Sequence, residues 1–346
     1  MPRVELTGGA APGAAPACSR EPEQLALFEG LGRVDVSGLR RERAAIAEAR
    51  RSVATRRAYA ADWSDFAAWC AMAGRPSLPA SSDTVGLYLV HLGRRGLSVS
   101  TIGRRCAAIS AVHLAGGDAS PIDADVREVL CGLRRKLGVR PLHAKAAVGL
   151  AELRRMLEAC PRDLVGVRDR ALLLLGFAGG FRRSELAGLD LADVEVTKPG
   201  LVVRLARSKT DQEGAGREVG IHRGRRVLTD PVRALEAWIV ERGRWPGPLF
   251  CPVVRLRRDR GVAVRHRRMA AATVALVVKS AAVRAGLDAS VYAGHSLRAG
   301  CATVAAELGR DAQAIMGRTG HRSEAMVRRY VRHGSLFAVD PLAGAL

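Results

Sequence analysis

An interruption of helical periodicity near the middle of the chain constrains its fold most strongly. On both sides of it, apolar residues recur at steps of three and four, the pattern of amphipathic helices. Across residues 138–148 this pattern stops, and the chain reads as an extended basic linker containing Pro141, His143 and Lys145. A chain of 346 residues is long enough for a separate core on each side of such a linker. We therefore predict two domains.

The first domain is predicted to be an all-α bundle over residues 44–137. Thr55 is expected to cap its first helix, along which aromatic residues recur at helical spacing. Such a stripe is typical of a core-facing helix, and stacking on nucleic-acid bases is the alternative interpretation. Three further helices are predicted, at 82–93, from 100 to 114, and after Pro121.

The second domain is predicted to be mainly helical with a small β-hairpin, over residues 149–335. Two short strands, 201–205 and 217–221, flank a turn-rich loop at 208–216. Helical patterns precede and follow this hairpin. The chain ends are expected to be an N-terminal arm with a disordered, Gly/Ala/Pro-rich start, residues 1–43, and a C-terminal tail, residues 336–346.

The charge of the chain indicates a polyanionic partner. Lys+Arg number 55 and Asp+Glu 34, which gives a formal net charge of +21. Such an excess favours nucleic acid, because neutralising phosphates releases counterions. Basic residues in the predicted third and fourth helices and in the linker are candidates for phosphate contacts, although a solvated face explains each group equally well. These candidates are Arg104, Arg105, Arg134, Arg135 and Lys145.

Membrane and metal sites are not indicated by the sequence. The longest apolar run, Ala171 to Ala178, is too short to span a bilayer. The seven cysteines lack CxxC pairs and histidines at metal spacing, which favours buried thiols in a reducing compartment. We expect a cytoplasmic protein without a metal site.

Three short motifs in the second domain carry groups that suit phosphodiester chemistry. They are Gly180-Phe-Arg-Arg-Ser-Glu-Leu186, His295-Ser-Leu-Arg298, and Gly320-His321 followed nine residues later by Tyr330. Each motif alone is a weak signal, because such residues often lie on surfaces or pack in helices. Their ordered combination supplies two arginines, two histidines and a phenol, the groups needed to attack a phosphodiester without a metal.

The chemistry of these side chains suggests separate roles. Attack on an anionic phosphodiester needs cations at its oxygens, and arginine provides a charged planar fork, so Arg182 and Arg298 are candidates. His295 and His321 can donate hydrogen bonds or carry protons near neutral pH. Tyr330 can form a covalent phosphoryl intermediate. A further residue, Glu185, lies three positions after Arg182 and is expected to orient the arginines or histidines.

This combination resembles the tyrosine recombinase family, also called phage-type integrases. The first motif is similar to the family's first arginine box, the second to its HxxR box, and the third to its Gly-His pair with the nucleophilic tyrosine. The resemblance covers roughly residues 45–335. It implies two domains, an N-terminal all-α core-binding bundle (SAM-like) and a mainly α catalytic domain with a small β-hairpin, the tyrosine recombinase catalytic fold.

The resemblance also implies a mechanism without a metal or other cofactor. Tyr330 would attack the scissile phosphate and form a 3′-phosphotyrosyl link, while Lys209 in the hairpin loop would protonate the departing 5′ oxygen. The two arginines and two histidines would hold the phosphoryl group. The implied partners are duplex DNA and further copies of the chain in a tetramer on DNA, with the tail docking on a neighbouring subunit. The protein would then be cytoplasmic and nucleoid-associated.

Two other functions stay open at the level of sequence. One is a type IB-like topoisomerase, which shares the chemistry but does not exchange partners. The other is a catalytically silent DNA-binding protein with the same fold. The presence of all six catalytic candidates argues against a silent binder, since DNA binding alone does not need all of them. These candidates are Arg182, Lys209, His295, Arg298, His321 and Tyr330. The helical first domain and the apolar tail favour a site-specific recombinase over a topoisomerase.

Overall fold

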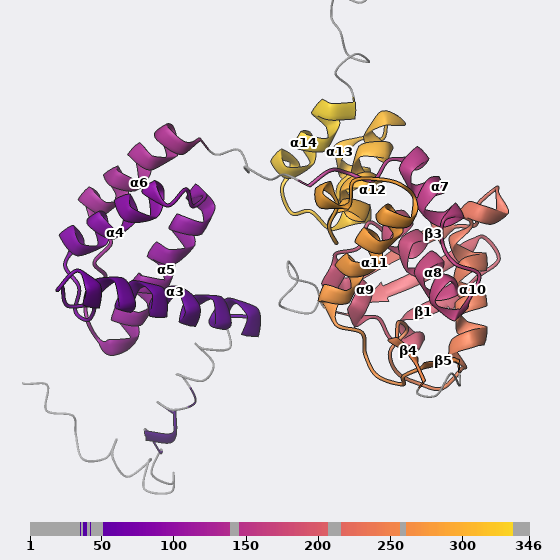
Figure 1. Ribbon diagram of the computed structural model, residues 1–346, viewed down its shortest axis with the longest axis horizontal. Coiled ribbons are helices and arrows are strands. Elements are labelled where there is room, and N and C mark those ends of the chain that lie inside the picture. The colour runs from indigo at the N-terminus through magenta and orange to yellow at the C-terminus, as the bar shows by residue number, and fades with distance from the viewer. Residues whose placement is uncertain are drawn as a thin grey trace, which may run out of the picture. The chain divides into compact units, whose positions relative to one another are not determined.

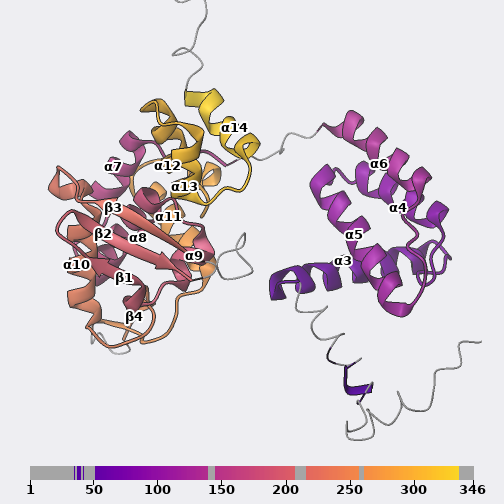
Figure 2. The same ribbon diagram turned by 180° about the vertical axis from the view of Figure 1, so that it is seen from behind.

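The protein divides into two compact units in the computed structural model, Met1–Pro141 and Leu142–Leu346 (Figures 1 and 2). The structure describes residues 35, 37–39, 42, 51–138, 145–206, 216–256 and 261–334. Lys209, the tail and most of the predicted N-terminal arm lie outside these described residues.

The N-terminal unit is a bundle of helices, as predicted. A side-chain oxygen just before each helix accepts a backbone N–H of the first turn. These capping residues are Ser52, Ser81, Ser98 and Asp123. The helices are Val53–Met72 (α3), Ser82–Arg94 (α4), Val99–Gly116 (α5) and Ala124–Leu137 (α6).

The prediction that Thr55 caps the first helix was wrong by one turn. Ser52 is the cap, and its hydroxyl accepts the backbone N–H of Thr55 at 3.2 Å. Thr55 therefore lies inside the first turn, where its N–H has no carbonyl partner within the helix. The aromatic stripe faces the core, as expected: Phe66 is fully buried, and its ring meets that of Tyr88 edge-on at 5.0 Å.

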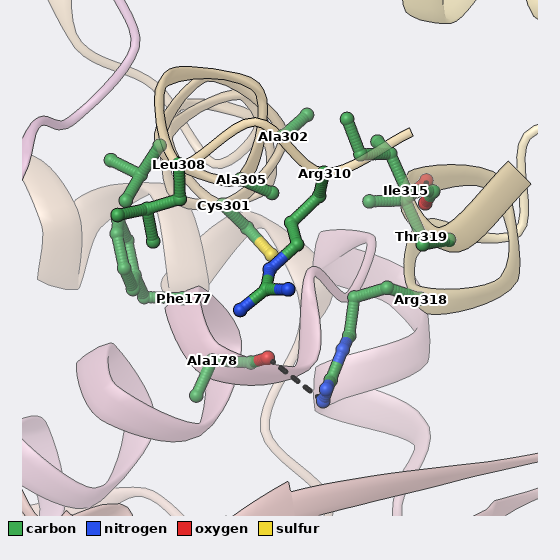
Figure 3. A pocket seen from close by; sticks show the side chains of 12 residues that line it. Phe177, Ala178, Cys301, Ala302, Ala305, Leu308, Arg310, Ile315, Arg318 and Thr319 are labelled. Carbon is green, nitrogen blue, oxygen red and sulfur yellow. Dashed lines mark hydrogen bonds between the residues drawn. The ribbon is translucent and has the colours of Figure 1, made fainter. Parts of the chain in front are cut away.

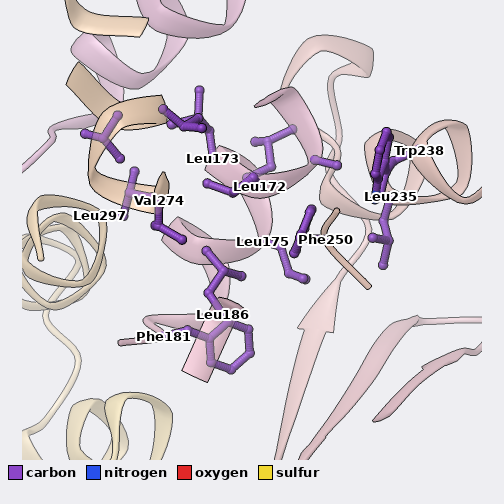
Figure 4. Packing of buried hydrophobic residues seen from close by; sticks show 14 of the residues in the cluster. Leu172, Leu173, Leu175, Phe181, Leu186, Leu235, Trp238, Phe250, Val274 and Leu297 are labelled. Carbon is purple, nitrogen blue, oxygen red and sulfur yellow. The ribbon is translucent and has the colours of Figure 1, made fainter. Parts of the chain in front are cut away.

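The second unit is built around one buried helix, α8 (Leu164–Gly179). Nearly all of its faces are covered, since α10 (Pro231–Arg242), α12 (Ser296–Glu307) and strand β3 (Arg217–His222) all contact it. Figure 4 shows its leucines between Leu297 and Val274 on one side and Leu235, Trp238 and Phe250 on the other. From Ala171 to Gly179 this helix has no charged residue, and a helical segment that is apolar all round is expected at the centre of a domain.

An antiparallel sheet lies beside α8 and ends at the active-site candidates. Its strands are Val194–Val196 (β1), Gly200–Leu205 (β2) and β3, in the order β1-β2-β3. Leu205 pairs with Arg217, so the two strands open onto the loop that contains Lys209. The predicted hairpin is therefore present, with β1 added at the far edge of β2. A separate pair is formed by Val253–Arg255 (β4) and Val262–Val264 (β5).

Short helices complete the second unit around this centre. They are Leu150–Glu158 (α7), Arg183–Gly188 (α9), Ala271–Arg284 (α11), Ala312–Thr319 (α13) and Glu324–Gly334 (α14). α14 and α13 pack on α12 (Figure 1). Within the described part of the chain, no helix is long and apolar enough to cross a membrane, and no three metal-binding side chains gather at one point.

Candidate active site

Arg182 is the cap residue just before α9, and it follows the turn that ends α8. Gly180 adopts φ +60°, a left-handed conformation that glycine tolerates without strain, and this reverses the chain. Arg182 then stands at the helix start, where its backbone N–H donates to Glu185 Oε2 at 2.9 Å. Its guanidinium donates through Nη1 to Glu185 Oε1 and through Nη2 to the Gly320 carbonyl at 2.9 Å. One buried arginine thus joins the first motif to the Gly-His pair.

Glu185 is the shared carboxylate of the site. It is only 6% exposed, and besides Arg182 it accepts from Arg217 Nη2 at 3.4 Å. A buried carboxylate flanked by two guanidiniums offsets part of their mutual repulsion. Glu185 therefore lies where an arginine-orienting residue is needed.

Arg217 was missed by the sequence interpretation. It is the first residue of β3, and its Nη1 donates to the carbonyls of Gly317 at 3.3 Å and Arg318 at 2.6 Å. Among the described residues its Nε is buried without a hydrogen-bond partner. Burial lowers the pKa of Arg217, and Glu185 counteracts this. The available signal was its position across the hairpin mouth from Leu205, beside the loop that carries Lys209.

Arg298 lies on α12 with only 4% of its surface exposed. Its Nη1 donates to the Gly180 carbonyl at 2.9 Å and also to the Thr319 carbonyl. Burial, followed by the positive charge of Arg182, lowers its pKa to about 10, so the side chain is still charged at neutral pH. Arg298 therefore links the turn after α8 to the C-terminal end of α13.

His321 follows a second left-handed glycine, Gly320, at φ +67°. The imidazole is 8% exposed, and its Nδ1 lies 2.6 Å from the hydroxyl of Thr319. Burial, and then the charges of Arg298, Arg182 and Arg217, lower its pKa to about 4, with Glu185 opposing them. His321 is therefore neutral at pH 7 in the DNA-free protein.

Tyr330 lies on α14 beside His321. The centroids of the two rings are 5.9 Å apart and the rings are tilted by 37°. The tyrosine packs on a small apolar cluster that includes Ala302, Ile315 and Val327. This packing fixes the phenol next to the imidazole and the buried arginines.

Three more residues were predicted to take part in catalysis or DNA binding, namely His295, Lys209 and Lys145. His295 stands at the N-terminal end of the helix that carries Arg298, and it is exposed. Lys209 lies outside the described residues. Lys145 precedes α7, and its Nζ donates to the Ser290 carbonyl at 2.7 Å.

The basic candidates of the N-terminal unit differ in how they are held. Arg104 makes a two-pronged contact with Asp62 at 2.8 and 3.0 Å, and Arg105 contacts Asp65 and the Tyr88 hydroxyl. These contacts tie α5 to α3 and α4. The two arginines at the end of α6, Arg134 and Arg135, are exposed.

In the second unit, Arg182, Arg217 and Arg298 gather positive charge beside a neutral imidazole, and the imidazole lies beside a phenol. Arg182 and Arg298 are buried yet fixed by carbonyl and carboxylate acceptors, which preorganises them for an anion. A phosphodiester held there would lie beside Tyr330, a side chain able to act as a nucleophile. The arrangement suits transfer of a phosphoryl group to the tyrosine.

Comparison with known proteins supports this interpretation. Residues 149–335 match the model of the phage integrase family. An integrase/recombinase xerD homolog of Selenomonas ruminantium is 38% identical over 293 residues, covering 83% of this chain and 84% of that protein. Recombinase cre of Escherichia phage P1 is 27% identical over 287 residues, covering 78% and 80%.

Solved structures share the fold at low sequence identity. A lambda integrase dimer bound to a COC′ core site matches with a TM-score of 0.55 and 14% identity, covering 85% of this chain and 94% of that one. The Tn1549 transposon integrase in complex with transposon right end DNA matches with a TM-score of 0.51 and 16% identity, covering 78% and 87%. The family match over residues 149–335 and the relative that is 38% identical establish that the chain belongs to the phage integrase family, the tyrosine recombinases.

Proposed function

We propose that the chain is a site-specific DNA recombinase that cuts and rejoins duplex DNA through a 3′-phosphotyrosyl intermediate. The observation that carries this proposal is the convergence of Arg182, Arg298, His321 and Tyr330 from four separate elements. A DNA-binding protein has no need to bury two arginines beside a tyrosine, because exposed cations suffice to neutralise phosphates.

In the proposed reaction, Tyr330 attacks the scissile phosphorus and the bond to the 5′ oxygen breaks. Arg182 and Arg298 hold the non-bridging oxygens, while His295 at the start of α12 and His321 in the turn after α13 add donors. Lys209 gives a proton to the departing oxygen. Because the ester to tyrosine conserves the bond energy, the 5′-hydroxyl of another strand can reverse the step without a cofactor.

Duplex DNA is the proposed substrate. Two of the structural relatives are complexes with DNA, and the chain carries a net charge of +21. The exposed Arg134 and Arg135 are proposed phosphate contacts of the N-terminal unit, with Arg104, Arg105 and Lys145 as weaker candidates, since all three already bind protein oxygens. Phosphate contacts position a protein but do not select a sequence.

The proposed assembly on DNA is a tetramer, acting in the cytoplasm at the nucleoid. An apolar cavity of about 340 Å³ lies between α8, α12 and α13, lined by Phe177, Cys301 and Leu308 among others (Figure 3). We assign its occupant as the tail of a neighbouring copy, residues 336–346, because that segment combines Leu, Phe and Val with few charges. Removing residues 336–346 is expected to abolish tetramers on DNA while single subunits still bind.

The test is to lyse cells in strong detergent and sequence DNA retained covalently on the protein. Tyr330→Phe is the matched control, since it removes one oxygen. Retained DNA with one recurrent sequence in the wild type, and none in the variant, supports a recombinase. Adducts without sequence preference support a topoisomerase. No adduct on the gene's native flanking DNA would overturn the proposed chemistry.

A further inference from the structure

Arg183 is an exposed arginine that directly follows Arg182 in the first motif. It is the first residue of α9, and it makes no hydrogen bond or ion pair with any other residue that the structure describes. Arg182, by contrast, is 8% exposed and donates to Glu185 and to the Gly320 carbonyl. Of two neighbouring arginines, one is therefore bound inside the protein, whereas the other is available to a ligand.

The stem of Arg183 lies against Gly294, the residue just before His295. A Cβ added at Gly294 would lie 3.2 Å from both Cβ and Cδ of Arg183, and 3.4 Å from Cβ of Ala275 on α11. These separations are shorter than the usual contact between two carbon atoms, so glycine allows the arginine to lie this close. Arg183 is therefore placed beside His295, although the two residues belong to separate motifs.

The exposure of His295 defines the side from which DNA reaches the site. Arg182 and Arg298 are buried, whereas His295 at the start of α12 is exposed. A phosphate that contacts all three must therefore enter past the histidine. The DNA strand that carries this phosphate then continues over the surface around His295, which is where Arg183 lies.

The charge of Arg183 is not neutralised by the described protein. Arg182 and Arg217 pair with one carboxylate, Glu185, so positive charge already exceeds negative charge in the site. Arg183 adds a further guanidinium next to Arg182 in the chain. Like charges gathered in this way cost free energy in the DNA-free protein, and a bound anion removes that cost.

We propose that Arg183 binds a phosphate next to the scissile phosphate and so sets the register of the DNA strand in the site. The inference rests on the proposed function, in which Arg182, Arg298 and His295 contact the scissile phosphate. Arg183 lies over Gly294 on the exposed side, so it meets the strand beyond that phosphate. A guanidinium can donate two parallel hydrogen bonds to phosphate oxygens, which fixes the strand as well as attracting it.

Three variants separate the charge of Arg183 from its packing. Arg183→Gln removes the charge and keeps most of the stem, and Arg183→Lys keeps the charge. Arg233→Gln is the matched control, because Arg233 is also an exposed arginine in the first turn of a helix, α10, without a hydrogen bond or ion pair to the described residues. α10 and α12 lie on opposite sides of α8 (Figure 4).

The first measurement is the salt dependence of DNA binding by the full chain, in a Tyr330→Phe background that prevents the covalent step. Each phosphate contact contributes about −0.9 to the slope of log affinity against log salt, so one contact is worth about a 3- to 4-fold change between about 50 and 200 mM. We expect this slope to be about 0.9 less negative in Arg183→Gln, and unchanged in Arg183→Lys and Arg233→Gln. An unchanged slope in Arg183→Gln would overturn the inference.

The second measurement identifies the phosphate. In the duplex recovered by the adduct sequencing, the phosphates on either side of the scissile one are replaced, one at a time, by neutral methylphosphonates. At one of them the loss of affinity should equal that of Arg183→Gln, and the two changes together should cost no more than either alone, because both remove the same contact. Losses that multiply at every flanking phosphate would show that Arg183 binds none of them.

The outcomes separate this inference from the proposed function. Failure of the wild type to form any covalent adduct would refute the proposed function, whereas the salt measurement would still test Arg183 on any duplex, because it does not need cleavage. An adduct in the wild type with an unchanged slope in Arg183→Gln would refute only the role of Arg183. Equal changes of slope in Arg183→Gln and Arg183→Lys would mean that its packing on Gly294 matters rather than its charge, and would also overturn the inference.

Discussion

Replacing Glu185 with glutamine removes the negative charge that two buried arginines share. Glu185 accepts from the backbone N–H of Arg182 at 2.9 Å, from its guanidinium, and from Arg217 at 3.4 Å. Glutamine has nearly the same shape but carries only one carbonyl oxygen, and its amide nitrogen must face a donor. The Glu185→Gln variant therefore leaves positive charge buried without its counterion.

The expected cost is large because the group is buried. Removing one partner of a buried ion pair typically destabilises a protein by about 3–5 kcal/mol, and the Glu185 side chain is 2% exposed. Glu195→Gln is the matched control, since Glu195 pairs with Arg204 at 2.5 Å but is 52% exposed. An exposed pair of this kind contributes about 0–1 kcal/mol.

Urea unfolding of the full chain measures this difference. With Trp63→Phe and Trp69→Phe as background, tryptophan fluorescence reports Trp238 and Trp245, which lie in the second unit. A DNA phosphate supplies the missing negative charge, so the target duplex should stabilise Glu185→Gln more than it stabilises the parent protein. If Glu185→Gln costs no more than Glu195→Gln, the shared-carboxylate account of the site is wrong.

Three further predictions concern the turn that holds His321. Because burial and the neighbouring arginines lower the pKa of His321 from 6.5 to about 4, the unfolded chain binds more protons than the folded chain within this window. The free energy of unfolding should therefore fall, by up to about 3 kcal/mol, as the pH drops from 6.5 to 4, and His321→Gln should flatten the profile measured by urea titration. Gly309→Ala should cost roughly 1–2 kcal/mol through left-handed strain alone, because Gly309 has open space around it. Gly320→Ala should cost more, because its Cβ would also lie 3.0 Å from the Arg217 guanidinium. Equal costs for the two variants would contradict this prediction. Arg217→Lys should slow adduct formation without weakening DNA binding, since lysine cannot reach the carbonyls of both Gly317 and Arg318. The control Arg223→Lys, on the exposed face, should change neither the adduct rate nor DNA binding. A normal adduct rate in Arg217→Lys would count against a role for Arg217 in the site.

Periodicity and motif spacing predicted much of this structure. The long helices were predictable because each has an apolar face of several turns, as with the leucines of α8. The six-residue α9 and the three-residue β1 were not, because such short elements contain too few residues to show a period. α9 depends instead on the contact between Arg182 and Glu185 that caps it.

The site residues also divide into those that could be predicted from the sequence and those that could not. Arg182, Arg298, His321 and Tyr330 belong to motifs that can be recognised in sequence. Arg217 carries no such mark, because its role depends on the carbonyl of Arg318, which lies 101 residues away along the chain. The contact between the Thr319 hydroxyl and Nδ1 of His321 joins residues only two positions apart, yet no motif in the sequence marks it.

The identity of the residue that carries DNA tests the central claim most directly. Purified protein is incubated with a nicked form of the recovered duplex that traps the covalent state, then digested with trypsin and nuclease. Mass spectrometry should find the nucleotide on the peptide containing Tyr330, with none in Tyr330→Phe. A nucleotide linked to any other residue, or an adduct that persists in Tyr330→Phe, would contradict the account.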